Sequence, residues 1–178
     1  MKLLIYRDSY EAVRDELQAR PEVEPLIMER DGTVTSAAGV PADDASFEIA
    51  WLSRHLFLGE GAPIGPYVKK VLTTPGVRWL QSGAAGYEHP TFQAVLAAGI
   101  RLSINDGSSI AIAEYVMAQV MAAFHPDVER AQAKAARAWT RFPFRELYRS
   151  RWVILGYGSI GQHVAARASA FGAEVVGI

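Results

Sequence analysis

A phosphate-binding turn is indicated by six residues near the end of the sequence: Gly156, Tyr157, Gly158, Ser159, Ile160 and Gly161. In this spacing the first glycine permits a tight turn, and the second lets the backbone approach a pyrophosphate. The third glycine lets a helix pack closely against the preceding strand. The free N–H groups and the positive dipole end of that helix favour phosphate. The six residues therefore predict a dinucleotide-binding site.

The segments around this turn have the order that such a site requires. The apolar run Trp152–Leu155 predicts a strand buried on both faces, and Ser159–Phe171 predicts a helix. Gly172 ends the helix, and Glu174–Ile178 predicts a second parallel strand. GxGxxG alone is a weak signal, and a glycine turn that binds nothing is the alternative. Its position between a strand and a helix favours a cofactor-binding βαβ unit.

The acidic residue that binds the cofactor ribose is expected at the tip of the second strand, about 20 residues past the glycines. Glu174 stands at the beginning of that strand, at the opposite edge of the sheet. The sequence therefore does not choose between NAD and NADP. Because two strands alone leave an open apolar edge, we expect the chain to continue beyond Ile178.

Short apolar runs alternate with amphipathic segments over the first hundred residues. Strands are predicted at Lys2–Tyr6, Pro25–Glu29, Phe47–Leu52, Val77–Gln81 and Ile100–Ile104. Helices are predicted at Ser9–Ala19, Gly65–Leu72 and His89–Ala98, and a loop at Asp31–Asp44. Helix-length connections between strands indicate a parallel sheet with right-handed crossovers. Residues 1–104 are therefore predicted to form one α/β domain.

Two further helices are predicted between this domain and the glycine turn. Ser108–Phe124 is apolar nearly all round, which predicts burial between packed bodies and a role as a domain link and subunit contact. The second helix, Asp127–Thr140, opens a stretch rich in arginine. A solvated helix face explains these charges better than a phosphate or nucleic-acid patch does. Residues 105–178 are predicted to be linking helices followed by the first βαβ unit of a second domain.

The composition excludes several other classes of function. Eighteen Lys and Arg face nineteen Asp and Glu, so no net positive charge favours nucleic acid. With no cysteine there is no disulfide or thiolate metal site, which fits a reducing, cytoplasmic location. No metal site is predicted. The most apolar stretch, residues 110–124, contains Glu114 and is shorter than the roughly 20 residues of a membrane span.

Three segments, which together cover most of the chain, resemble the D-isomer-specific 2-hydroxyacid dehydrogenases. Val77–Glu88 resembles that family's substrate loop, in which the N–H groups at Ala85 and Gly86 would bind the substrate carboxylate. Asn105–Tyr115 resembles the turn and the domain-linking helix, and Arg151–Ile178 resembles the cofactor βαβ unit. The fingerprint lies after a complete α/β domain, as is typical of this family.

This resemblance implies a flavodoxin-like parallel-sheet substrate domain followed by the start of a Rossmann dinucleotide-binding domain. The implied reaction is reversible hydride transfer between NAD or NADP and a small 2-oxo or 2-hydroxy acid, in a homodimer. Arg54 and Asn105, which follow predicted strands, are candidate substrate contacts. A surface salt bridge of Arg54 and a local structural role of Asn105 are the alternatives.

The family's catalytic groups, an Arg and a His paired with a Glu, are implied to lie beyond residue 178. The four histidines present, His55, His89, His125 and His163, have no acidic partner that the sequence places beside them. We therefore assign no catalytic residue within 1–178. Two rivals remain: a non-catalytic NAD(P)-sensing or partner-binding protein on the same fold, and another Rossmann enzyme such as a methyltransferase.

Overall fold

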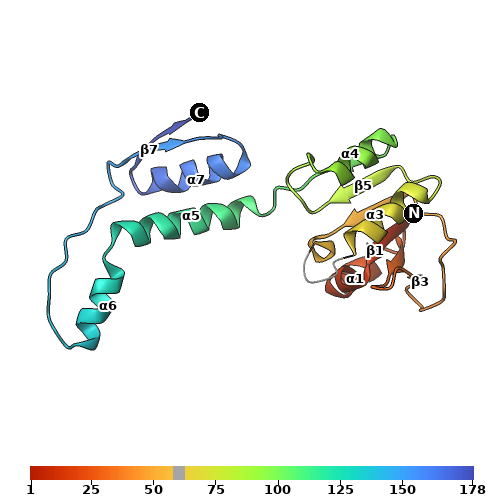
Figure 1. The fold of residues 1–178 in the computed structure, drawn as a ribbon, viewed down its shortest axis with the longest axis horizontal. Coiled ribbons are helices and arrows are strands. Elements are labelled where there is room, and N and C mark those ends of the chain that lie inside the picture. The colour runs from red at the N-terminus through yellow and green to blue at the C-terminus, as the bar shows by residue number, and fades with distance from the viewer. Residues whose placement is uncertain (58–62) are drawn as a thin grey trace. The chain divides into compact units, whose positions relative to one another are not determined.

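The computed structural model describes residues 1–57 and 63–178, which Figure 1 traces from red to blue. The chain divides into two compact units, Met1–Asn105 and Asp106–Ile178. Each unit has its own strands and its own buried side chains. The two are therefore described separately.

The first unit is built on a six-stranded sheet with the order β3-β2-β1-β4-β5-β6. Its strands are β1 (Lys2–Tyr6), β2 (Glu24–Met28), β3 (Val34–Ser36), β4 (Ile49–Leu52), β5 (Trp79–Ser82) and β6 (Arg101–Ser103). All neighbours are parallel except β3, which runs antiparallel to β2. Without β3 the order is that of flavodoxin-like sheets. The predicted α/β fold class is confirmed.

Two details of this unit differ from the sequence prediction. The expected loop Asp31–Asp44 contains β3, whose first residue, Val34, pairs with Met28 and is buried. Turn-forming residues on both sides of such a short strand concealed it. The helix expected at Ser9–Ala19 is instead two, α1 (Arg7–Ala12) and α2 (Arg14–Gln18).

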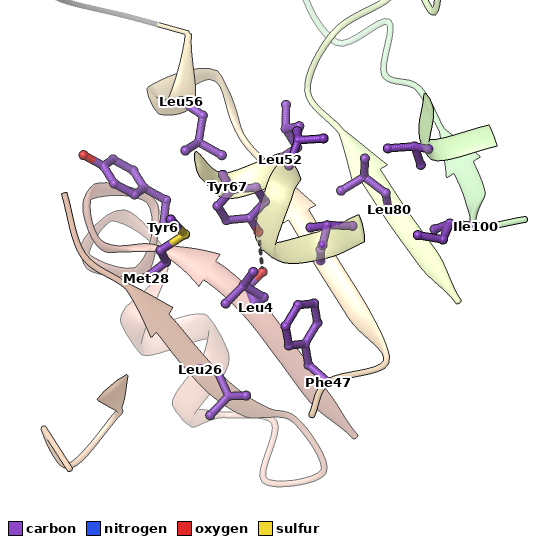
Figure 2. Packing of buried hydrophobic residues seen from close by; sticks show 14 of the residues in the cluster. Leu4, Tyr6, Leu26, Met28, Phe47, Leu52, Leu56, Tyr67, Leu80 and Ile100 are labelled. Carbon is purple, nitrogen blue, oxygen red and sulfur yellow. Dashed lines mark hydrogen bonds between the residues drawn. The ribbon is translucent and has the colours of Figure 1, made fainter. Parts of the chain in front are cut away.

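Helices cover both faces of this sheet. On one face, α3 (Ile64–Thr73) and α4 (Pro90–Ala97) pack against the larger hydrophobic cluster, shown in Figure 2. The Tyr67 hydroxyl is fully buried there and shares its proton between the backbone oxygens of Leu4 (2.8 Å) and Trp51 (3.0 Å). Burial raises the pKa of this phenol. A smaller cluster fixes α1 and α2 on the opposite face.

The second unit contains a two-stranded parallel sheet and three helices. Its elements are α5 (Ser109–Phe124), α6 (Asp127–Ala135), β7 (Arg151–Ile154), α7 (Ser159–Ala170) and β8 (Glu174–Gly177). Met117 on α5 and Ala168 on α7 share a buried cluster with Leu147. None of the helices in residues 1–57 and 63–178 has the length and hydropathy to cross a membrane.

Burial in this unit is less complete than the sequence predicts. Strand β7 was expected to be covered on both faces, yet Val153 is 64% exposed. Helix α5 was expected to be buried nearly all round, yet Tyr115 is also 64% exposed. Trp152 and Val175 belong to the covered face of the sheet, and no cluster of the described residues includes Val153 or Val176. Helix α6 ends at Ala135, short of the expected Thr140.

Candidate functional site

The glycine turn of the second unit joins the end of β7 to the beginning of α7. Gly156 has φ +90°, a conformation that side-chain-bearing residues rarely adopt, and its N–H donates to Ile178 O at 2.7 Å. This bond continues the pairing of β7 with β8 past the end of the strands. The first glycine is therefore required by the backbone itself.

The other two glycines differ in what surrounds them. A Cβ at Gly161 would overlap the Gly156 carbonyl oxygen and lie 3.3 Å from Ile154 Cγ2, so glycine is needed for α7 to approach β7. A Cβ at Gly158 would meet nothing within 4 Å. The open space at Gly158 is where a ligand can approach the backbone closely, which fits the pyrophosphate of a dinucleotide.

The beginning of α7 offers hydrogen-bond donors at this turn. The N–H groups of Ser159, Ile160 and Gly161 have no backbone acceptor within the described ranges. They stand at the positive end of a 12-residue helix. The Ser159 hydroxyl donates to Asp106 Oδ2 at 2.8 Å. This arrangement suits an anion, and a phosphate in particular.

Tyr157 and Ile160 complete the predicted cofactor residues. Both are partly exposed, Tyr157 at 48% and Ile160 at 38%. The Tyr157 ring lies against Gly177 of β8, where a Cβ would overlap it. All six residues of the predicted turn thus lie between the ends of β7 and β8 and the first turn of α7.

The predicted substrate residues of the first unit lie where three neighbouring strands end. Gly83, after β5, donates its N–H to Leu52 O at 2.8 Å, and its Cβ would lie 3.3 Å from Arg54 N. Asn105, after β6, donates its N–H to Ala84 O at 3.0 Å. Since parallel strands end at one edge, the backbones at Arg54, Gly83–Gly86 and Asn105 are brought together there.

The loop itself presents exposed backbone. Ala85 and Gly86 are exposed, and no backbone acceptor for their N–H groups is found among the described residues. Tyr87 N–H donates to a carboxylate oxygen of Glu88 at 3.0 Å, so an amide of this loop already binds a carboxylate. The Arg54 side chain is exposed and forms no ion pair with any described acid.

A buried polar cluster beside Arg54 was not predicted. The Ser9 hydroxyl bonds Ser53 Oγ and lies 3.1 Å from His55 Nδ1. Ser9 and Ser53 are 1% and 4% exposed. The cluster holds the residues on both sides of Arg54 to α1. No spacing signal could reveal it, because Ser9 is 44 residues from Ser53.

Three of the four histidines, His55, His89 and His125, have structural partners. His89 caps α4 by accepting the Thr91 N–H at 3.3 Å, and His125 stacks on Phe144 at 5.0 Å. None of the four pairs with a carboxylate within residues 1–57 and 63–178. No group of three potential metal ligands is found in that part of the chain either.

Comparisons with known proteins address the cofactor unit. Residues 117–178 match the family described as D-isomer specific 2-hydroxyacid dehydrogenase, NAD binding domain. A 75-residue stretch is 40% identical to D-3-phosphoglycerate dehydrogenase of Methanocaldococcus jannaschii, covering 40% of this chain and 14% of that protein. These matches confirm the predicted family resemblance, and the matched family model is that of an NAD-binding domain.

Solved structures share the fold. A D-lactate dehydrogenase of Treponema pallidum superposes with a TM-score of 0.64 at 21% identity, over 99% of this chain and 53% of that one. A D-isomer specific 2-hydroxyacid dehydrogenase of Xanthobacter autotrophicus, in complex with NADPH and MES, gives 0.64 at 18% identity, over 99% and 53%. The chain thus spans about half the length of these proteins.

Proposed function

We propose an oxidoreductase function because residues 117–178 match the family described as D-isomer specific 2-hydroxyacid dehydrogenase, NAD binding domain. The protein would transfer a hydride between NAD or NADP and a small 2-oxo or 2-hydroxy acid of D configuration. The observation that carries this proposal is the glycine turn, where Gly161 is packed against Gly156 while Gly158 stays open to a ligand.

In this proposal the glycine turn after β7 and the glycine loop after β5 each bind one anionic group. The N–H groups of Ser159, Ile160 and Gly161 would bind the cofactor pyrophosphate, with Gly158 leaving room for it. When bound, the nicotinamide supplies the hydride chemistry. The N–H groups of Ala85 and Gly86 would bind the substrate carboxylate.

Two further residues of the same sheet edge would orient the substrate. Arg54 would add a positive charge, since its guanidinium has no acidic partner among the described residues. Asn105, whose backbone is bonded to Ala84, would provide a side-chain amide beside the loop. Residues 1–104 would then be the substrate domain, and 105–178 the linking helices and first βαβ unit of the cofactor domain.

We propose that no residue of 1–178 supplies the acid/base set of the reaction. Its support is that no histidine among the described residues pairs with a carboxylate. If that set proves absent, the alternative function is NAD(P) sensing or partner binding without catalysis.

We further propose a cytoplasmic homodimer, with the helices between Ser108 and Thr140 as the subunit contact. Exposed apolar side chains on α5 support this contact, among them Ile112, Tyr115 and Met121. Light scattering of the complete protein at micromolar concentration tests it. A monomer under those conditions would contradict the dimer.

Turnover tests the reaction class. The complete protein is mixed with NADH or NADPH and with glyoxylate, hydroxypyruvate or pyruvate, and nicotinamide absorbance is followed. We expect oxidation of NADH or NADPH with at least one of these 2-oxo acids. In the reverse direction, the D-hydroxy acid but not the L-hydroxy acid should reduce the oxidised cofactor. Saturable NAD(P)H binding with no turnover would instead favour the sensing function.

A further inference from the structure

One carboxylate lies beside the turn where the cofactor pyrophosphate is expected. Asp106, just before α5, accepts a hydrogen bond from the hydroxyl of Ser159, the first residue of α7, at 2.8 Å. The two residues are 53 positions apart in the sequence. Their contact lies within the second unit, beside the glycine turn.

The packing of two helices holds Asp106 in this place. Helices α5 and α7 share the buried cluster of Met117 and Ala168. They are also linked farther along by Arg167, which donates to Glu114 at 3.2 Å. A carboxylate at the beginning of a helix is stabilised by the helix dipole and by the free N–H groups there. Asp106 therefore has a favourable position in the absence of any ligand.

A bound pyrophosphate and Asp106 would compete for the Ser159 hydroxyl. The Ser159 hydroxyl has a single proton to donate, so it bonds either Asp106 or a phosphate oxygen. The two anions would also repel each other at the same helix end. The cofactor thus has to break the Asp106–Ser159 bond or accept a negative charge beside it.

We propose that Asp106 lowers the cofactor affinity. Its carboxylate is an internal anion that binds Ser159 of the glycine turn Gly156–Gly161 (the phosphate turn) and is displaced when the cofactor binds. The inference rests on the proposed cofactor role of the turn. In this role Asp106 weakens NAD(P) binding and speeds cofactor release. It does not stabilise the bound state. The carboxylate would stabilise the turn when no cofactor is present.

Equilibrium binding of NADH to the complete protein, followed by nicotinamide fluorescence, tests this role. Asp106→Asn keeps an oxygen that can accept from Ser159 and removes the charge, so its Kd should fall roughly 2- to 5-fold, the effect of one exposed charge at a helix end. Asp106→Ala should tighten binding as well. The gain should shrink at high salt, because the repulsion is screened there.

Glu114→Gln is the matched control. It removes an exposed carboxylate that pairs with Arg167, two turns beyond Ser159. The buried contact of Met117 with Ala168 still holds the two helices together, so the Kd should equal that of the wild type. Thermal unfolding without cofactor shows that each variant is folded. An unchanged or raised Kd in both Asp106 variants would overturn the proposal while leaving the cofactor role intact. Absence of NADH and NADPH binding in the folded wild type and variants would overturn both.

Discussion

The two glycine turns of this chain both follow a parallel strand, but different forces hold them. In the turn after β7, Gly156 has a positive φ and Gly161 has no room for a Cβ beside the Gly156 carbonyl. In the loop after β5, neither Gly83 nor Gly86 has a positive φ, and the atom nearest to a Cβ at Gly86 is the end of the Glu88 side chain. The first turn needs Gly156 and Gly161, whereas the second largely does not need its glycines.

The glycines of the two loops therefore have different roles. In the turn after β7 the backbone itself requires Gly156 and Gly161, so any protein that folds this turn needs glycine at those positions. The substrate loop is fixed instead by hydrogen bonds to its neighbours, through Gly83 N–H and Ala84 O, which residues of many types could make. Substitutions in the two turns should therefore have effects of different size and kind.

Gly161→Ala should have the largest effect. Its Cβ would overlap the Gly156 carbonyl oxygen, so α7 must move away from β7. We expect a loss of about 1–3 kcal/mol in the free energy of unfolding, as for an overpacked core site, and at least tenfold weaker NADH binding. Urea unfolding and NADH fluorescence measure both. A variant with the wild-type free energy of unfolding and the wild-type Kd for NADH would contradict close packing of α7 against β7 at Gly161.

Gly158→Ala should weaken cofactor binding without weakening the fold. Its φ of −80° suits alanine, and the added methyl meets no protein atom within 4 Å. We expect unfolding free energy within about 0.5 kcal/mol of the wild type, but a 10- to 100-fold higher Kd for NADH, about 1.4–2.8 kcal/mol. Comparison with Gly161→Ala separates a steric block of the ligand from damage to the turn. Equal stability losses in both variants would contradict this separation.

Arg54→Ala should change substrate recognition only. The side chain is exposed and has no acidic partner in the described chain, so stability should stay within about 0.5 kcal/mol. Loss of a charge-assisted bond to the substrate carboxylate should raise KM for the 2-oxo acid roughly tenfold. Arg20→Ala, another exposed arginine that forms no ion pair with a described acid, is the control and should leave KM unchanged. Equal KM values in the two variants would remove Arg54 from the substrate site.

Gly83→Ala and Gly86→Ala should differ slightly within the substrate loop. At Gly83 the new methyl lies 3.3 Å from Arg54 N, a backbone atom, and we expect a cost of about 1 kcal/mol. At Gly86 it meets the mobile end of Glu88, so the cost should be below about 0.5 kcal/mol. Urea unfolding measures the free energy of unfolding of both variants. A larger loss at Gly86 would mean that this loop, like the phosphate turn, depends on its last glycine.

The smallest effect is expected from the Arg7–Glu29 pair of the first unit. Arg7 donates to both carboxylate oxygens of Glu29 and lowers its pKa in the folded protein. The pair therefore stabilises the fold above the unfolded value of 4.5, and this contribution is lost as the pH falls through the lower folded pKa. Glu29→Gln should cost roughly 0.5–1 kcal/mol at pH 7. Urea unfolding at pH 7 and pH 3 should show a smaller difference between wild type and variant at the lower pH.

Local features of the chain could be predicted, and contacts between distant residues could not. The phosphate turn, α5 and the parallel sheet follow from glycine spacing and hydrophobic periodicity, which act over a few residues. Strand β3 was missed because its three residues lie among turn-forming ones. The Ser9–Ser53 and Asp106–Ser159 contacts join residues 44 and 53 positions apart, so only the folded chain brings them together. The loop after β5 became a candidate substrate site through the family resemblance, because its glycines and alanines alone do not distinguish an anion-binding loop from an ordinary turn.

The most direct test of the account is a binding titration of the wild-type protein with NADH, NADPH and S-adenosylmethionine. A GxGxxG turn that binds a dinucleotide should enhance or quench nicotinamide fluorescence saturably for NADH or NADPH, at micromolar concentration, the range common for such cofactors. S-adenosylmethionine should not compete. Tight binding of S-adenosylmethionine by a folded protein that leaves both nicotinamide cofactors unbound would contradict the account.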